Sequence, residues 1–195
     1  MGETRKAPPR AVGESVLLIA VPEAEPVVGG VRERYDTAAA EGIPAHLTVL
    51  YPFLPAGRID AEVLAALHEL FAEYRPFALR FAEFGRFPGA LWLAPQPDGP
   101  VRELTAAVAA RWPEAPPYGG AFDDPVPHLT VAQGQEERTY DGIEREFADR
   151  LPFQAQVAEV RLLVFDGAWQ RLAVFPLGGG SRSGSGHRTR GAGFR

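Results

Sequence analysis

One tetrapeptide occurs twice in this chain, as His46-Leu47-Thr48-Val49 and again as His128-Leu129-Thr130-Val131. Both copies lie in stretches that are typical of strands, and a proline precedes each histidine by one or two residues. Successive side chains of a strand point to opposite faces, so each copy places its histidine and threonine on one face and its leucine and valine on the other. Each motif therefore presents an imidazole and a hydroxyl in front of two aliphatic anchors.

The elements around the two copies repeat in similar order, which is the main indication of the fold. In the first half we expect strands at 15–22, 45–53, 77–87 and 90–94, and helices at 26–35 and 59–74, the second of them capped by Asp60. In the second half we expect helices at 100–112 and 140–151, and strands at 128–132, 157–165 and 169–176. If the halves pack about a pseudo-two-fold axis, the two His-Thr pairs converge on one cleft.

Two imidazoles and two hydroxyls in one cleft suit phosphoryl chemistry. A neutral imidazole can take a proton from the attacking water or hydroxyl, while a protonated one gives a proton to the leaving oxygen. Histidine's ordinary pKa of about 6.5 makes both states accessible near neutrality. Threonine hydroxyls can hydrogen-bond the non-bridging oxygens, where charge develops. We therefore predict His46 and His128 as the catalytic pair and Thr48 and Thr130 as phosphate-binding residues.

Two other interpretations of the histidines remain open. A strand histidine is often a structural residue bonded to a neighbouring backbone carbonyl, although two identical copies at matching places favour a shared role. Two imidazoles could also bind zinc, but a zinc site normally has three or four protein ligands, and no carboxylate lies at a fixed short spacing from both histidines. We expect no metal and no cofactor.

The doubled motif resembles that of the 2H phosphoesterase superfamily, and within it the bacterial 2'-5' RNA ligase and cyclic phosphodiesterase-like family. The similarity spans about residues 15–177 in the order of elements and is specific at the two motifs. It implies a bilobal α+β fold in which pseudo-two-fold duplicated antiparallel sheets, with helices on the outside, surround a central cleft. It also implies chemistry without metal or ATP: the opening of 2',3'-cyclic phosphates, or reversible 2'-5' joining of RNA ends, with one histidine as general base and the other as general acid.

Composition excludes several other classes of protein. None of the 195 residues is cysteine, which rules out disulfides, thiolate zinc sites and cysteine nucleophiles. The formal net charge is −5, and because 178–195 carries four arginines and no acid, residues 1–177 carry −9. Such an acidic body argues against binding duplex DNA. No apolar run approaches the roughly 20 residues that cross a bilayer, and the N-terminus does not resemble a signal peptide.

These observations lead to an expected setting for the protein. We expect a cytoplasmic monomer without membrane partners, whose substrate is an RNA end or a small cyclic nucleotide. The 19 arginines beside one lysine indicate a GC-rich bacterial gene. We divide the chain into a flexible N-terminal arm, 1–14, a domain of two interleaved lobes, 15–177, and a disordered Gly/Ser/Arg tail, 178–195.

Substrate selection is expected from the loops 54–58, 85–89 and 113–127. Aromatic side chains can stack a base, and arginine can bind a phosphate with two hydrogen bonds, although such aromatics often belong to the core and such arginines to the solvated surface. The candidate substrate contacts are Tyr51, Phe53, Arg86, Trp92 and Arg171, with Phe87 and Trp169 as further aromatic candidates.

A second hypothesis is a cleft that binds a nucleotide or RNA end without catalysis. Its motivation is that no fixed basic residue is evident near the motifs. We favour the enzyme because both histidines and both threonines are intact. Whether it acts as hydrolase or ligase stays open, since the same acid–base pair serves either direction.

Overall fold

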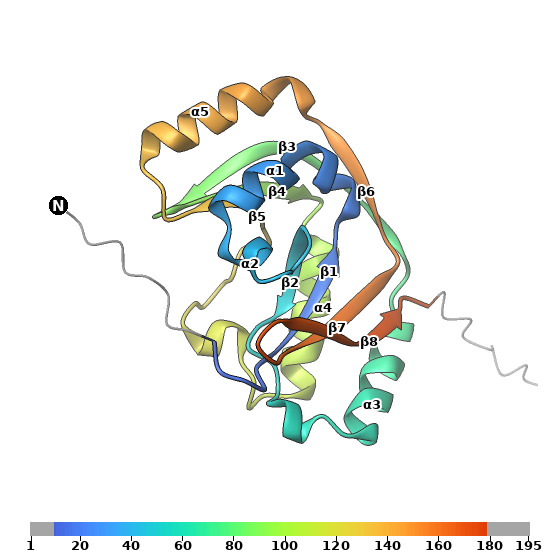
Figure 1. Cartoon of the computed structure of the whole chain (residues 1–195). Coiled ribbons are helices and arrows are strands. Elements are labelled where there is room, and N and C mark those ends of the chain that lie inside the picture. Colours follow the sequence, from blue (N-terminus) through green and yellow to red (C-terminus); the bar gives the residue numbers. More distant parts are fainter. Residues whose placement is uncertain (1–9, 179–195) are drawn as a thin grey trace, which may run out of the picture.

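Two four-stranded antiparallel sheets form the framework of the computed structural model, which describes residues 10–178 (Figure 1). The first sheet has the order β2-β1-β7-β8 and comprises β1 (Ser15–Ala20), β2 (His46–Leu50), β7 (Glu159–Phe165) and β8 (Trp169–Pro176). The second has the order β5-β4-β3-β6 and comprises β3 (Phe77–Phe87), β4 (Ala90–Gln96), β5 (Leu129–Gln133) and β6 (Phe153–Val157). The predicted α+β class with two antiparallel sheets is confirmed.

Two helices each connect strands of one sheet but pack against the other sheet. The α-helices are α1 (Glu25–Tyr35), α2 (Thr37–Ala40), α3 (Ala61–Ala72), α4 (Gly99–Arg111) and α5 (Glu137–Phe147). The helix α1, which leads from β1 towards β2, packs against β5 of the other sheet, while α4, which connects β4 to β5, packs against β2. The helix α3 lies against β8, and α5 lies beside α1 (Figure 1). Each motif strand is therefore covered by a helix from the other half of the chain.

The larger of two hydrophobic clusters joins both sheets and their helices. It includes Leu17 and Leu47 from the first sheet, Phe81 and Leu129 from the second, and Leu104 from α4, all fully buried. The central strand β1 is buried over Ser15–Ile19, as its nearly continuous apolar sequence predicts for a strand covered on both faces. The two sheets consequently share one packed interior.

Most predicted elements are confirmed, with ends that differ by a few residues. The hairpin of β3 and β4 turns at Pro88-Gly89, where Gly89 adopts a φ of 80° that favours glycine. The predicted strand 157–165 is confirmed as β7, which begins at Glu159 and pairs with β1, but the strand β6 before it, which pairs with β3, was not predicted. The adjoining segments carry the same strand-like pattern, so the sequence did not show where the chain crosses between sheets.

The structure describes residues 10–14 of the predicted N-terminal arm and residue 178 of the predicted tail. In residues 10–14, Gly13 N donates to the Phe165 carbonyl at 2.8 Å. The Arg10 guanidinium lies 5.3 Å from the Tyr51 ring centroid and 5.2 Å from that of Trp169. Predictions for 1–9 and 179–195 lie outside the described residues. Within 10–178, no helix combines the length and apolar character needed to cross a membrane.

The start of α3 provides a test of the fold away from the motifs. The Asp60 carboxylate accepts a hydrogen bond from Val63 N at 2.9 Å, which satisfies a free backbone donor of the first turn. Replacing Asp60 by Ala should lower the free energy of unfolding by about 1 kcal/mol, measured by urea denaturation. The control Asp60→Asn keeps the acceptor, so an equal loss in that variant would contradict the capping role.

Candidate active site

The two motif strands meet although they belong to different sheets. The strands β2 and β5 are each the edge strand of a sheet, and they contact one another. On the core-facing side of these strands, the four aliphatic side chains of the motifs are at most 1% exposed. The two histidines and two threonines are half-buried on the other face. The aliphatic residues are Leu47, Val49, Leu129 and Val131. The predicted alternation of the motif is confirmed.

Each imidazole is held by the same local hydrogen bond. Nδ1 of His46 lies 2.8 Å from the Pro44 carbonyl, and Nδ1 of His128 lies 2.8 Å from the Val126 carbonyl. A carbonyl oxygen can only accept, so each Nδ1 carries the hydrogen. Nε2 of each ring is then a base when the imidazole is neutral and an acid when it is protonated. The carbonyl bond expected of a structural histidine is thus compatible with proton transfer at the other nitrogen.

The surroundings of both imidazoles disfavour their charged forms. Loss of water lowers the pKa of His46 to about 4; the Pro44 carbonyl opposes this change, and the positive charges of Arg32, His128 and Arg10 add to it. Burial also lowers the pKa of His128, against the effect of the Val126 carbonyl. The strands that carry the two rings contact one another, and His128 is among the charges that act on His46, so the two rings lie near each other. Both are mainly neutral at pH 7 when the site is empty.

An aromatic wall from the β3–β4 hairpin stands beside His128. Trp92 lies opposite Thr130 in the pairing of β4 with β5. The Phe87 ring stacks on Trp92 at 4.9 Å between centroids, and Phe87 and Trp92 approach the His128 ring at 5.0 and 6.1 Å. Gly85 makes room for the indole, since a Cβ there would lie 2.3 Å from the Trp92 ring. The structure therefore brings the predicted contact Trp92 to His128.

A largely apolar cavity of about 550 Å³ opens next to His128. Two of the three loops expected to select the substrate line it, the tip of the β3–β4 hairpin and the loop 113–127. Its lining residues are Phe87, Pro88, Tyr118, Phe122, Asp124, Pro125, Val126 and His128. The cavity can accept an apolar group of a ligand that binds beside His128.

Tyr118 joins this cavity to the first motif, a role that the sequence did not reveal. Its backbone N–H donates to the Tyr51 carbonyl just after β2, and its phenol lies beside the Thr48 hydroxyl. It has a φ of 52°, a left-handed conformation that is unusual for a bulky residue. A Pro/Gly-rich loop gives no periodic signal, so the position of this phenol depends on the tertiary contact with β2.

The other four candidate substrate contacts are engaged elsewhere. Phe53 is 5% exposed and meets the Trp112 ring edge-on at 5.4 Å, while the Tyr51 hydroxyl accepts from Arg10 at 2.8 Å.

Arg86 pairs with three carboxylates of α5, namely Glu137 at 2.6 Å, Asp141 at 2.6 Å and Glu144 at 2.9 Å. Arg171 is exposed on β8, the opposite edge of the first sheet from β2. Of the five candidates, the structure places Trp92 against a catalytic candidate.

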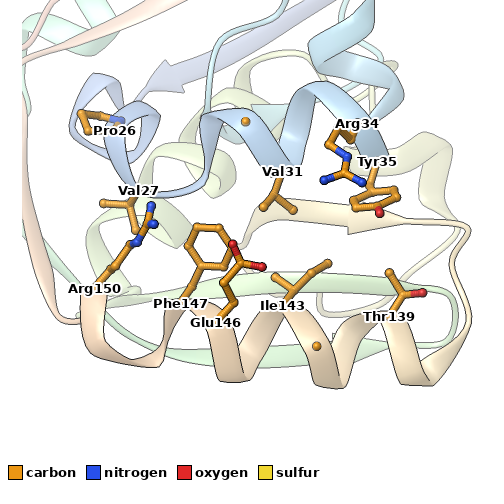
Figure 2. A pocket seen from close by; sticks show the side chains of 12 residues that line it. Pro26, Val27, Val31, Arg34, Tyr35, Thr139, Ile143, Glu146, Phe147 and Arg150 are labelled. Carbon is orange, nitrogen blue, oxygen red and sulfur yellow. The ribbon is translucent and has the colours of Figure 1, made fainter.

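A second hollow, between α1 and α5, contains no motif residue. It has a volume of about 560 Å³, and Val31, Tyr35, Ile143 and Phe147 line it together with Arg34 and Arg150 (Figure 2). Within residues 10–178, no three His, Cys, Asp or Glu side chains gather where they could hold a metal ion. The face of β2 and β5 that carries the two histidines and two threonines, with the cavity beside His128, is the candidate active site.

Comparison with protein families agrees with this assignment. The model of the 2'-5' RNA ligase superfamily matches residues 20–169, a range that includes both motifs. The chain belongs to this superfamily. A Bacillus licheniformis relative named "Putative phosphoesterase" is 24% identical over 174 residues, which cover 84% of this chain and 97% of the relative. A Bacillus pumilus relative of the same name is 31% identical over 121 residues, or 60% and 68% of the two chains.

Solved structures share the fold of this superfamily member. LigT of E. coli complexed with 3'-AMP is 22% identical, with a TM-score of 0.54, and the match covers 86% of this chain and 99% of LigT. TT0787 of Thermus thermophilus is 20% identical, with a TM-score of 0.55, covering 86% and 100%. The likeness extends over nearly the whole of both solved chains, so the arrangement of two sheets is common to them.

The contact between Gly85 and Trp92 can be tested by adding one methyl group. Gly85→Ala should displace the indole and lower the free energy of unfolding by about 1–3 kcal/mol, the usual cost of overpacking. Urea denaturation measures the loss, and near-ultraviolet circular dichroism reports the displaced ring. Gly57→Ala is the control, because a Cβ at Gly57 meets no atom within 4 Å. Equal stability of the two variants would contradict the close packing at Gly85.

Proposed function

We propose that this member of the 2'-5' RNA ligase superfamily is a metal-independent phosphodiesterase that opens 2',3'-cyclic phosphates of RNA ends or nucleotides. The observation that carries the proposal is the pair of imidazoles on two edge strands that contact one another. Each has its Nδ1 held by a carbonyl and its Nε2 left for proton transfer. Reversible 2'-5' joining of RNA ends would use the same pair with a ribose hydroxyl in place of water.

The proposed reaction divides the proton transfers between the two histidines. His46, whose pKa is lowered to about 4, stays unprotonated over the wider pH range and takes a proton from water as its oxygen attacks phosphorus. The bond from phosphorus to the 2' or 3' oxygen breaks, and His128 gives that oxygen a proton. A bound phosphate favours the protonated state of a neighbouring imidazole, which prepares His128 as the acid. The product is an acyclic phosphomonoester.

Thr48 and Thr130 support this reaction by binding the phosphate. They lie on the same face of the motif strands as the histidines, and their hydroxyls can donate to the non-bridging oxygens. The apolar cavity beside His128 is suited to a nucleobase, because aromatic side chains stack bases of any identity. Complexes of E. coli LigT with 3'-AMP and with NADP+ support a nucleotide substrate.

Removal of either motif histidine should abolish most of the activity. We expect His46→Ala and His128→Ala each to lower kcat for a 2',3'-cyclic nucleotide by about 100-fold or more, since positioned acid–base catalysis contributes that much. Turnover is measured in EDTA by chromatography of the ring-opened product. His68→Ala is the matched control, because His68 is an exposed residue of α3.

The same experiment separates the enzyme from a binding module. Undiminished turnover by His46→Ala would contradict the acid–base mechanism, and loss of wild-type activity in EDTA would contradict metal independence. Binding of the cyclic nucleotide by the wild type with no turnover would support the non-catalytic alternative.

The pKa changes predict the pH dependence of the free enzyme. Below about pH 4 His46 gains the proton that blocks a general base, and above the pKa of His128, which burial holds below its ordinary 6.5, the general acid is lost. The value of kcat/KM should therefore form a bell whose maximum lies on the acid side of neutrality. A kcat/KM that rises steadily from about pH 5 to 9 would exclude this assignment.

A further inference from the structure

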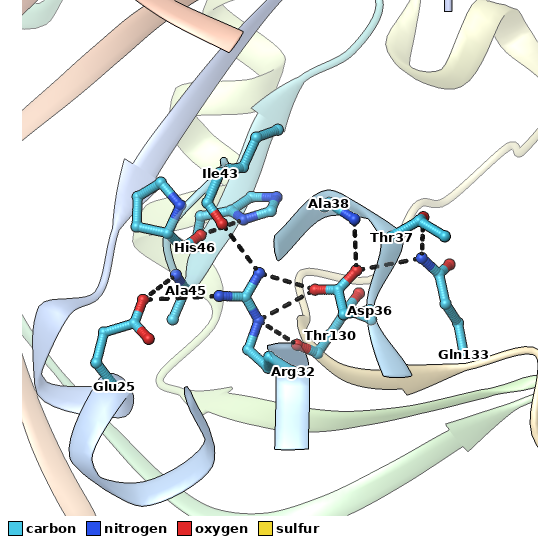
Figure 3. Close-up of polar contacts among 11 residues, drawn as sticks. Glu25, Arg32, Asp36, Thr37, Ala38, Ile43, Ala45, His46, Thr130 and Gln133 are labelled. Atoms are coloured by element: carbon cyan, nitrogen blue, oxygen red, sulfur yellow. Dashed lines mark hydrogen bonds and ion pairs between the residues drawn. The ribbon is translucent and has the colours of Figure 1, made fainter. Parts of the chain in front are cut away.

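A buried arginine lies behind the two motifs and contacts the strand of one and the segment before the other. Arg32 of α1 has a side chain that is 2% exposed, and it donates through Nε to the Thr130 carbonyl at 3.2 Å (Figure 3). Its Nη2 lies 3.4 Å from the Ile43 carbonyl, three residues before His46. One guanidinium therefore connects the strand of the second motif with the segment that leads into the first.

Two carboxylates extend this contact into a network. Asp36 accepts from Nε of Arg32 at 3.0 Å and from Nη2 at 2.8 Å, and its second oxygen accepts from Gln133 at 3.1 Å. Glu25 lies 3.7 Å from Arg32 and accepts from Ala45 N, the residue before His46, at 2.6 Å. The network thus runs from the start of β2 to the end of β5 (Figure 3).

The burial of Arg32 and Asp36 argues for a role in placing other groups. Two charges removed from water are stable together only when they are paired and hydrogen-bonded, and such a pair often stabilises a fold no better than apolar side chains would. The planar guanidinium of an arginine can, however, hold several acceptors in fixed directions. Here the acceptors include two carbonyls of the motif segments, so the pair fixes the relative position of the motifs.

The corresponding contact in the other half of the molecule is uncharged. The helix α4 covers β2 as α1 covers β5, and Thr105 of α4 donates to the Val49 carbonyl at 2.8 Å. The two halves therefore use helix-to-strand hydrogen bonds at similar places, one from a guanidinium and one from a hydroxyl. This difference makes two identical motifs electrically unequal.

We propose that Arg32, paired with Asp36, is a positioning residue that holds the two motifs at their working separation. It also distinguishes His46 from His128, because the guanidinium end of this buried ion pair lies towards His46 (Figure 3). The catalytic consequence rests on the proposed function, whereas the effect on the imidazoles does not. The charged groups that act on His46 are Arg32 from α1, Arg10 from the N-terminal segment and His128 next to β5. Asp36 and Glu25 face Arg32, and Glu41 pairs with Arg10.

The first test titrates the histidines directly and needs no substrate. In protein labelled with 13C-histidine, NMR should give a lower pKa for His46 than for His128. Arg32→Met, which removes the charge at similar length, should raise the pKa of His46 and leave that of His128 unchanged. Asp36→Asn, which leaves the guanidinium without its partner, should lower the pKa of His46 further. A role confined to stability would not move the pKa in opposite directions.

Matched variants separate charge from position. Arg34→Met removes another arginine of α1, one that lies over the Tyr35 ring, and Thr105→Val removes the uncharged contact on β2. Neither should change the pKa of His46. Arg32→Lys keeps the charge but not the fork, so we expect a nearly unchanged pKa of His46 with kcat lowered by about 100-fold, as for misplaced catalytic groups. KM should change little, since Arg32 lies beneath the motifs.

Distinct results would overturn this proposal and the proposed function. An Arg32→Met variant with an unchanged pKa of His46 and an unchanged kcat, or an Arg32→Lys variant with an unchanged kcat, would overturn the role of Arg32. If Arg32→Met does not fold, Arg32→Lys and Asp36→Asn still decide the question. A wild type that shows the expected titration but turns over no cyclic nucleotide would overturn the proposed activity alone.

Discussion

Burial of the aliphatic side chains of the two motifs is the constraint on which the site depends. Leu47, Val49, Leu129 and Val131 are at most 1% exposed, and each buried aliphatic side chain contributes about 1.5–3 kcal/mol relative to exposure. A shift of either strand by one residue would expose its two aliphatic side chains and turn the imidazole into the core. The same packing that stabilises the two edge strands thereby fixes the direction of the catalytic candidates.

The packing of each helix against the other sheet brings the two edge strands together. Because α1 covers β5 and α4 covers β2, neither half of the chain completes its own layer, and both contribute to the larger hydrophobic core. The candidate active site lies where the two edges contact one another. Each helix is hydrogen-bonded directly to the backbone of a motif. Arg32 of α1 donates to the Thr130 carbonyl, and Thr105 of α4 donates to the Val49 carbonyl.

Identical motifs acquire different surroundings in this arrangement. Both imidazoles are oriented by a carbonyl two residues earlier, so their intrinsic geometry is the same. His46 has the positive charge of Arg32 behind it, whereas His128 stands against the rings of Phe87 and Trp92 beside an apolar cavity. The two imidazoles therefore differ through their neighbours and not through the motif itself.

The sequence by itself determined the features that depend on local residue types and their spacing. These are the alternation within the motifs, the hairpin at Gly89, the cap at Asp60 and the family to which the chain belongs. Those signals are local because the directions of strand and helix side chains follow from the backbone. Only the tertiary structure decided that 153–165 divides between two sheets, that Phe53 is buried, and that Arg32 and Tyr118 adjoin the motifs. These depend on which helix or loop covers which strand, since a buried charge or a left-handed tyrosine is stable only where distant residues supply its partners.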